Sequence, residues 1–338
     1  MAKNPLGLQR GGNSDNWFAL HPVSTISVLL SIALLSCLLI FELFLRTFSG
    51  LGNPPLYEIS PLFGYRLKPS QVIEPRGAVS FLYGARLTTN NLGLRAAGEW
   101  DSNPAGKILF LGDSVTYGGQ YIADSQLFSS LAGSRLQGWQ VGNGANNAWG
   151  IENIVGLIKD YDFLPAEVVV TCVIEGDFYR GLTRASSMPL WTKRPVFALQ
   201  DLAMHFTWRV NKSRYDIWAD QLTNNKDHLY KIVDRAARQL KEVDDYLKQK
   251  QIRHFVFILP TQSQTVDGES PDNLVEQMLQ KYEINAEYLL EELIQLEPDR
   301  NRRLQWYHDE AHLELAGHQA YGRLIGDTLA KALPERLK

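Results

Sequence analysis

The chain has 338 residues, 45% hydrophobic and 21% charged, which is enough apolar material for one large globular domain with additional segments. Its formal net charge is −3 and no block of lysine and arginine occurs, so a nucleic-acid partner, which needs clustered positive charge, is not expected. The two cysteines, Cys37 and Cys172, lie far apart in apolar runs, so neither a disulfide framework nor a zinc site is predicted.

The N-terminal region has the pattern of a membrane anchor. Residues 1–22 are polar and predict a cytoplasmic tail. Residues 23–46 predict a transmembrane anchor, because Val23 to Phe41 carries no charge and has about the ~20 apolar residues that a spanning helix needs. No convincing signal-peptide cleavage site follows. Lys3 and Arg10 precede the span and favour a cytoplasmic N-terminus, which leaves the rest of the chain periplasmic or extracellular. A buried core helix and lipidation at Cys37 are the alternatives.

Residues 47–106 predict a proline-rich, extended connector with lead-in strands, and residues 107–338 predict the main domain. Three short apolar runs have the composition of buried parallel strands: Lys107–Leu111, Glu167–Ile174 and His254–Leu259. Apolar residues recur at helical spacing over four further segments: Ile151–Lys159, His228–Gln251, Leu274–Leu296 and Leu313–Leu333. This alternation predicts an α/β fold with a parallel sheet covered on both faces, whose ligands bind at the carboxyl ends of the strands.

Residues 178–226 interrupt the alternation and predict an insertion, either a lid or a small subdomain. Tryptophans such as Trp191, Trp208 and Trp218 are interleaved with arginines and lysines. These side chains suit three roles: stacking on sugar rings, resting on the membrane interface, or packing a lid onto the body of the domain.

The first predicted strand is followed directly by Gly112-Asp113-Ser114, which places a serine hydroxyl at the carboxyl edge of the sheet. A serine becomes a nucleophile when a base accepts its proton and a further group orients that base. Asp309 and His312 have the required types, and their three-residue spacing lets the carboxylate reach one imidazole nitrogen while the other is aimed at Ser114. Alone, each motif also fits helix capping or surface polarity.

These motifs resemble those of the SGNH/GDSL hydrolases, in particular membrane-anchored bacterial members. Gly112 to Gly118 (GDSVTYG) looks like the first block of the family, and Asp309 to Leu313 (DEAHL) looks like the last. Phe63 to Pro69 and Thr89 to Arg95 are similar to the lead-in of the anchored members. The resemblance implies a flavodoxin-like three-layer α/β/α fold and ester hydrolysis or acyl transfer through an acyl-enzyme. It implies no metal and no cofactor.

The segments that match the middle blocks depart from the family pattern. The resemblance puts the oxyanion hole at Ser114, Ala148 and Gly176. Ala148 stands where the family has a glycine, and its N–H is retained. Gly176 stands where the family has an asparagine whose amide donates to the oxyanion, a loss that can cost ~2.7–4 kcal/mol of transition-state stabilisation. Asn146 and Asn147 are candidate substitute donors.

Three carboxylates near strand ends, Asp113, Glu175 and Asp177, suggest a magnesium site as an alternative, but this would leave Ser114 and the Asp-His pair unexplained. His308 and His318 are interpreted as a surface residue and a helix residue rather than as ligands.

The sequence thus predicts a serine esterase that hydrolyses O-acyl, for example O-acetyl, esters on a cell-surface glycan or a lipid. The alternatives are a catalytically impaired SGNH-like protein that binds or modifies exported polysaccharide, and an O-acyltransferase with the same triad. The expected partners are the ester substrate and, through the N-terminal helix, the membrane.

Overall fold

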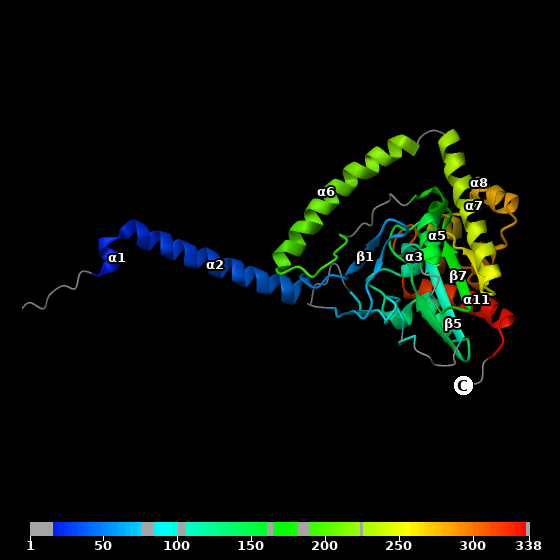
Figure 1. The fold of residues 1–338 in the computed structure, drawn as a ribbon, viewed down its shortest axis with the longest axis horizontal. Coiled ribbons are helices and arrows are strands. Elements are labelled where there is room, and N and C mark those ends of the chain that lie inside the picture. The colour runs from blue at the N-terminus through cyan, green and yellow to red at the C-terminus, as the bar shows by residue number, and fades with distance from the viewer. Residues whose placement is uncertain are drawn as a thin grey trace, which may run out of the picture.

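The computed structural model describes residues 16–75, 84–96, 98–100, 106–160, 165–181, 189–223 and 226–335. Most of the predicted cytoplasmic tail (1–15) and two parts of the predicted insertion (182–188 and 224–225) therefore lie outside the described residues. Two elements stand clear of the body, the N-terminal helix α2 and the long helix α6 (Figure 1).

The centre of the molecule is a five-stranded, fully parallel sheet in the order β6-β5-β7-β8-β9. Its strands are β5 (Gly106–Gly112), β6 (Trp139–Asn143), β7 (Val168–Val173), β8 (Arg253–Ile258) and β9 (Ala286–Tyr288). Counted along the sheet in chain order, this is the 2-1-3-4-5 order of flavodoxin-like folds. Every residue of β5 and β7 is buried, because both strands lie inside the sheet with covered faces.

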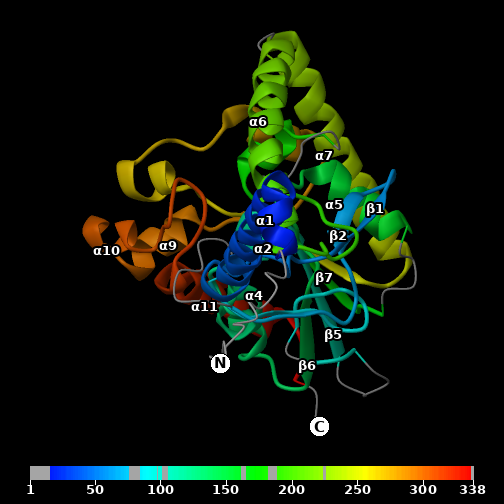
Figure 2. The ribbon, with the colours of Figure 1, turned by 90° about the vertical axis from the view of Figure 1, so that its left-hand side faces the viewer.

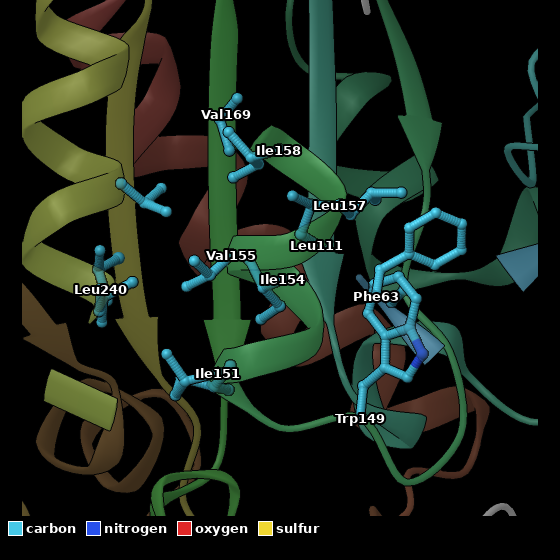
Figure 3. Packing of buried hydrophobic residues seen from close by; sticks show 14 of the residues in the cluster. Phe63, Leu111, Trp149, Ile151, Ile154, Val155, Leu157, Ile158, Val169 and Leu240 are labelled. Atoms are coloured by element: carbon cyan, nitrogen blue, oxygen red, sulfur yellow. The ribbon is translucent and has the colours of Figure 1, made fainter. Parts of the chain in front are cut away.

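Helices cover both faces of the sheet, so the predicted three-layer α/β/α fold class is confirmed. One face carries α5 (Ile151–Asp160), α7 (Lys226–Gln249) and α8 (Asn273–Lys281). The other carries α4 (Phe128–Gly133), α9 (Leu290–Leu296) and α11 (Leu315–Ala332). Successive side chains of β5 point to opposite faces of the sheet. Leu109 and Leu111 belong to the first core, under α5, α7 and α8, and Ile108 and Phe110 belong to the second, under α4, α9 and α11. Figure 3 shows α5 presenting apolar side chains to this first core, with Val169 and Leu240 beside them.

The helix expected over Leu274–Leu296 is wrong as a single element. The chain forms α8, then the edge strand β9, then α9. Glu283 adopts a left-handed conformation (φ 54°) just after α8, and the Ile284 N–H donates to the Leu279 carbonyl, which terminates the helix. The apolar spacing runs on across this break because α8 and α9 pack on opposite faces of the sheet.

The segment between the anchor and the sheet is more deeply buried than a surface connector. It forms two antiparallel hairpins, β1 (Tyr57–Ser60) with β2 (Gly64–Leu67) and β3 (Val72–Ile73) with β4 (Leu87–Thr88). Their inward side chains join the first core: Tyr57, Phe63, Tyr65, Leu67, Ile73 and Leu87. This lead-in segment is therefore part of the hydrophobic core on the face of the sheet that carries α5, α7 and α8.

The remaining helices are α1 (Trp17–Leu20), α2 (Pro22–Phe48), α3 (Ser114–Tyr117), α6 (Ala198–Thr223) and α10 (Arg300–Leu304). Helix α2 is long and apolar enough to cross a membrane, and nearly all of it projects from the body. Helix α6 occupies most of the predicted insertion. It leaves the end of α2 obliquely and runs to the start of α7 (Figures 1 and 2).

Candidate active site

The turn from β5 into α3 presents Ser114 at the carboxyl edge of the sheet. A Cβ at Gly112 would lie 2.1 Å from the Cys172 carbonyl oxygen of β7, so only glycine fits at this close approach. Asp113 caps the helix, since its carboxylate accepts the Val115 N–H at 2.9 Å. The Thr116 hydroxyl donates to the Cys172 carbonyl at 2.7 Å, which ties α3 to β7. Ser114 itself is only partly buried, so its hydroxyl is open to a ligand.

The structure brings together the three residues predicted from the two ends of the domain. The His312 Nε2 atom lies 2.8 Å from the Ser114 Oγ atom, and the His312 Nδ1 atom lies 2.7 Å from an Asp309 carboxylate oxygen. One imidazole nitrogen thus faces the hydroxyl and the other faces the carboxylate. In the tautomer with the proton on Nδ1, Nδ1 donates a hydrogen bond to Asp309 and Nε2 accepts a hydrogen bond from the Ser114 hydroxyl.

Asp309 is positioned by the backbone of the loop before α11. Its Oδ1 atom accepts the N–H groups of Ala311 at 3.0 Å and His312 at 2.9 Å, which fixes the carboxylate against the imidazole. Partial burial alone would raise the pKa of Asp309, but these hydrogen bonds and the His312 ring outweigh it and hold the pKa below its usual value. Asp309 therefore stays ionised at neutral pH.

Two backbone N–H groups beside Ser114 are available to a ligand. Within the described part of the chain, neither the Ser114 N–H nor the Ala148 N–H donates to a protein acceptor. Ala148 has a φ of 58°, a left-handed conformation that glycine adopts more readily than alanine. The expected donor N–H groups are thus present and unpaired.

Gly176, the third residue predicted to line an oxyanion hole, has no side chain that could donate a hydrogen bond. Gly176 is exposed in the turn that follows β7, and a Cβ there would meet only Ile174, at 3.5 and 3.8 Å. Of the two candidate substitutes, Asn146 is buried and its amide already donates to the Gly144 carbonyl. Asn147 is partly buried, and its side-chain amide makes no hydrogen bond with the described residues. Asn147 is therefore the more available donor of the two.

The β1–β2 hairpin supports the loop that carries Ala148. The Tyr65 hydroxyl donates to the Asn147 carbonyl, and the Trp149 indole N–H donates to the Tyr65 carbonyl at 2.9 Å. Trp149 is fully buried in the same core as Phe63, and both rings are visible in Figure 3. The lead-in segment thus binds the peptide group that precedes Ala148 and the side chain of Trp149 that follows it.

A partly buried arginine, Arg180, which sequence reasoning missed, joins the turn that carries Ser114 to the Ala148 loop. Arg180 contacts the carboxylates of Asp113 at 3.1 Å and Asp177 at 2.5 Å, and it donates to the Trp149 carbonyl at 3.2 Å. Asp177 is fully buried, and burial together with Asp113 raises its pKa well above the usual range. Burial lowers the pKa of Arg180, but the two carboxylates outweigh this and raise it, so the guanidinium keeps its charge.

This cluster bears on the magnesium alternative. The guanidinium of Arg180 occupies the position between Asp113 and Asp177 that a bridging cation would need. Glu175 is bound separately, by the Gln264 side chain at 2.7 Å and the Asp272 N–H at 2.8 Å. Within the described residues, no group of three or more His, Cys, Asp or Glu side chains has metal-binding geometry.

Arg95 is a second positioning residue that sequence reasoning missed. It lies in the lead-in motif. Its guanidinium donates to the carbonyls of Tyr117, the last residue of α3, and Gly119, and it pairs with Asp124. Apart from Asp177, three residues before Arg180, the partners of Arg95 and Arg180 are distant in the sequence, so no local pattern indicates that these arginines join separate segments. The two histidines that were not expected to be ligands have structural contacts. His308 pairs with Glu314 on the surface, and His318 is fully buried in α11.

No protein-family profile matches the sequence, and a search of curated proteins finds no match. Solved structures similar to the chain are GDSL-like lipases and acetyl xylan esterases. One is a putative GDSL-like lipase from Parabacteroides merdae, 11% identical, with a TM-score of 0.38 over 68% of this chain and 98% of that one. An acetyl xylan esterase, AlAXEase, is 14% identical, with a TM-score of 0.41 over 68% of this chain and 100% of that one. Axe2, an acetylxylan esterase from Geobacillus stearothermophilus, is 14% identical, with a TM-score of 0.33 over 70% of this chain and 100% of that one.

Proposed function

We propose that this chain is a membrane-anchored serine esterase of the SGNH/GDSL type, with Ser114 as nucleophile, His312 as base and Asp309 as the orienting group. The observation that carries the proposal is the continuous hydrogen-bonded line from the Ser114 hydroxyl through His312 to Asp309, at 2.8 and 2.7 Å. The first and last sequence blocks that resemble the SGNH/GDSL family are the segments that meet here. A partly exposed hydroxyl with a base in contact is the arrangement that acyl transfer requires.

The proposed reaction is ester hydrolysis in two half-reactions. The Ser114 Oγ atom attacks the ester carbonyl carbon while His312 Nε2 takes the hydroxyl proton, giving a tetrahedral oxyanion. Collapse breaks the ester C–O bond, and the imidazolium returns the proton to the leaving alcohol. His312 then removes a proton from a water molecule, whose oxygen attacks the acyl carbon. Collapse of this second intermediate breaks the bond between the acyl carbon and Ser114 Oγ, and the imidazolium returns its proton to Oγ, releasing the carboxylic acid and free Ser114. Asp309, held ionised, stabilises the imidazolium in both half-reactions.

The proposed oxyanion donors are the N–H groups of Ser114 and Ala148, with the Asn147 amide as a third candidate in place of the side chain that Gly176 lacks. Two donors stabilise the developing charge less than three, and one donor is worth about 2.7–4 kcal/mol in other acyl-transfer enzymes. We therefore expect a slow esterase.

The proposed location follows from α2. We propose that α2 spans a membrane with its N-terminus in the cytoplasm, so that the catalytic domain faces the periplasm or the cell exterior. The substrates that fit this location are O-acyl esters, such as O-acetyl groups, on a cell-surface glycan, with lipid esters as the second class.

A fluorophosphonate probe tests the nucleophile directly, because it forms a covalent bond only with an activated serine hydroxyl. We expect the full chain in detergent to be labelled, Ser114→Ala to lose labelling, and Ser134→Ala, an exposed serine on another surface, to keep it. Unlabelled wild-type protein that binds an acetylated glycan would instead support the catalytically impaired alternative, for which the missing side chain at Gly176 is the structural argument.

Hydrolysis and acyl transfer are separated by the acceptor. Wild-type protein given an acetyl ester and an unacetylated oligosaccharide should release acetate to water if it is an esterase. If the acetyl group is transferred to the oligosaccharide faster than free acetate is released, the chain is an O-acyltransferase with the same triad.

A further inference from the structure

The start of α6 is bound to the end of α2 by charged side chains. The Glu42 carboxylate accepts the N–H groups of Ala198 at 2.7 Å and Leu199 at 3.0 Å, the first two residues of α6. Arg46 pairs with Glu42 at 2.6 Å and donates to the Val196 carbonyl at 2.7 Å. A carboxylate from one helix thus caps the N-terminus of another. The position of the start of α6 along the axis of α2 is therefore fixed by the position of Glu42.

If α2 spans a bilayer, as proposed above, Glu42 lies at the edge of the hydrocarbon. The stretch Val23 to Phe41 has no charged residue and extends about 28 Å at ~1.5 Å per residue, close to the ~30 Å thickness of a hydrocarbon core. Glu42 is the first charged residue after this stretch. The first residues of α6 consequently lie at the boundary between lipid tails and headgroups.

This part of α6 exposes apolar side chains at helical spacing. Leu199, Leu202, Phe206 and Val210 are spaced by three, four and four residues, which places them along one face of the helix. Phe206 is 71% exposed, and Phe197, just before the helix, is 59% exposed. The neighbouring face is turned to the body of the protein, since Ala198 and Asp201 are fully buried. We call the four residues and Phe197 the α6 apolar stripe.

Exposed cations flank the stripe. Lys193 and Arg194 precede α6, and Arg209 and Arg214 lie further along it. An apolar face bordered by lysine and arginine is the composition of helices that lie in the interface of an anionic bilayer. Helix α6 leaves α2 obliquely (Figure 1), and tilts of ~0–40° are usual for a spanning helix, so a tilt of α2 can bring the stripe toward the membrane plane.

We propose that the α6 apolar stripe is a second membrane contact. Its side chains insert into the interfacial layer of the leaflet from which α2 emerges, and the flanking cations bind the phosphates of anionic lipids there. This inference rests on the proposal that α2 spans the membrane.

The test uses the full chain in vesicles of phosphatidylcholine and phosphatidylglycerol, with an environment-sensitive fluorophore on a single cysteine. Phe206→Cys and Phe197→Cys are made with Cys37→Ser. The control is Lys331→Cys, also made with Cys37→Ser, in the last turn of α11. Helix α11 lies on the opposite side of the body from α2 (Figure 1). The native Cys172 is buried and does not react. Because both phenylalanines are exposed, these substitutions should not disturb folding.

We expect lipids with a shallow spin label to quench the fluorophore at 206 and 197 by at least about twofold, and more strongly than lipids with a deep label. The control at 331 should remain unquenched. Replacing Arg209 and Arg214 by glutamine should reduce quenching at 206 in anionic vesicles and leave it unchanged in vesicles of phosphatidylcholine alone.

The native Cys37, exposed on α2, separates the two proposals. A fluorophore at Cys37 that is quenched by deep-labelled lipids, with no lipid quenching at 206 or 197, overturns the α6 contact and leaves the anchor standing. Absence of quenching at Cys37 overturns the anchor itself. Fluorophores at positions 206 and 197 could also be protected from quenching by aqueous iodide without being quenched by any lipid. This result would assign the stripe to a protein partner or a second copy of the chain, and would also refute the proposal.

Discussion

Restoring a side-chain donor at Gly176 should accelerate the proposed reaction. Gly176 does not adopt a left-handed conformation, and a Cβ there meets only Ile174 at van der Waals distance, so Gly176→Asn fits without strain. One oxyanion donor is worth about 2.7–4 kcal/mol, which corresponds to a roughly 100- to 1000-fold higher kcat if the amide reaches the oxyanion. A smaller gain is expected if Asn147 already supplies a third donor.

The assay is kcat for hydrolysis of p-nitrophenyl acetate by the detergent-solubilised full chain. Gly176→Ala is the matched control, because it adds the same Cβ without an amide. The double variant Ser114→Ala/Gly176→Asn measures turnover that bypasses the proposed nucleophile. The reasoning is refuted if the asparagine and alanine variants are folded and have equal kcat values, since the added amide would then have no role in the transition state.

Three further outcomes are expected. Asp309→Asn should lower kcat by about 10³–10⁴-fold at neutral pH without changing KM, because the imidazolium loses its counter-charge; an unchanged kcat would remove Asp309 from the site. Arg180→Met leaves two buried carboxylates uncompensated and should lower the free energy of unfolding by about 3–5 kcal/mol in urea titrations, with partial recovery when Asp177→Asn is added. Burial and the nearby Arg95 lower the pKa of His318 to about 3. The folding stability that neutral His318 provides is therefore complete above about pH 6.5 and is lost as the pH falls toward 3. At about pH 5 the free energy of unfolding should be lower by ~2 kcal/mol, and in His318→Gln this decline with pH should be shallower.

The central strands were predictable from the sequence because burial on both faces leaves long apolar runs. β5, β7 and β8 lie within one residue of their predicted limits at each end. β6 and β9 are short edge strands of 5 and 3 residues with polar residues such as Gln140 and Glu287, and an alternation this short does not distinguish a strand from a loop. Their positions follow from pairing with β5 and β8, which only the three-dimensional structure supplies.

The candidate site divides in the same way. Ser114, Asp309 and His312 stand in short motifs, and their types and spacing predicted the contacts that the structure contains. Arg180 bridges Asp113 and the Trp149 carbonyl, partners that lie 67 and 31 residues away along the chain. Such a bridge depends on how β5, β7 and the loop after β6 come together. It leaves no trace in a local pattern, so sequence reasoning had no means of finding it.

If α2 is an anchor, the contacts between α2 and α6 would also determine how the proposed catalytic domain moves relative to the membrane. A catalytic domain on a flexible tether searches a hemisphere whose radius grows with linker length. Here Leu45 and Leu51 are buried with Ala198, and the buried Asp201 carboxylate accepts the Gly52 N–H at 2.9 Å and the Trp191 indole N–H at 2.9 Å. These buried contacts hold the end of α2 and the start of α6 in a fixed relative orientation. If α2 is an anchor, the height of Ser114 above the lipid is constant, and substrates would be selected by how far their ester groups stand from the bilayer.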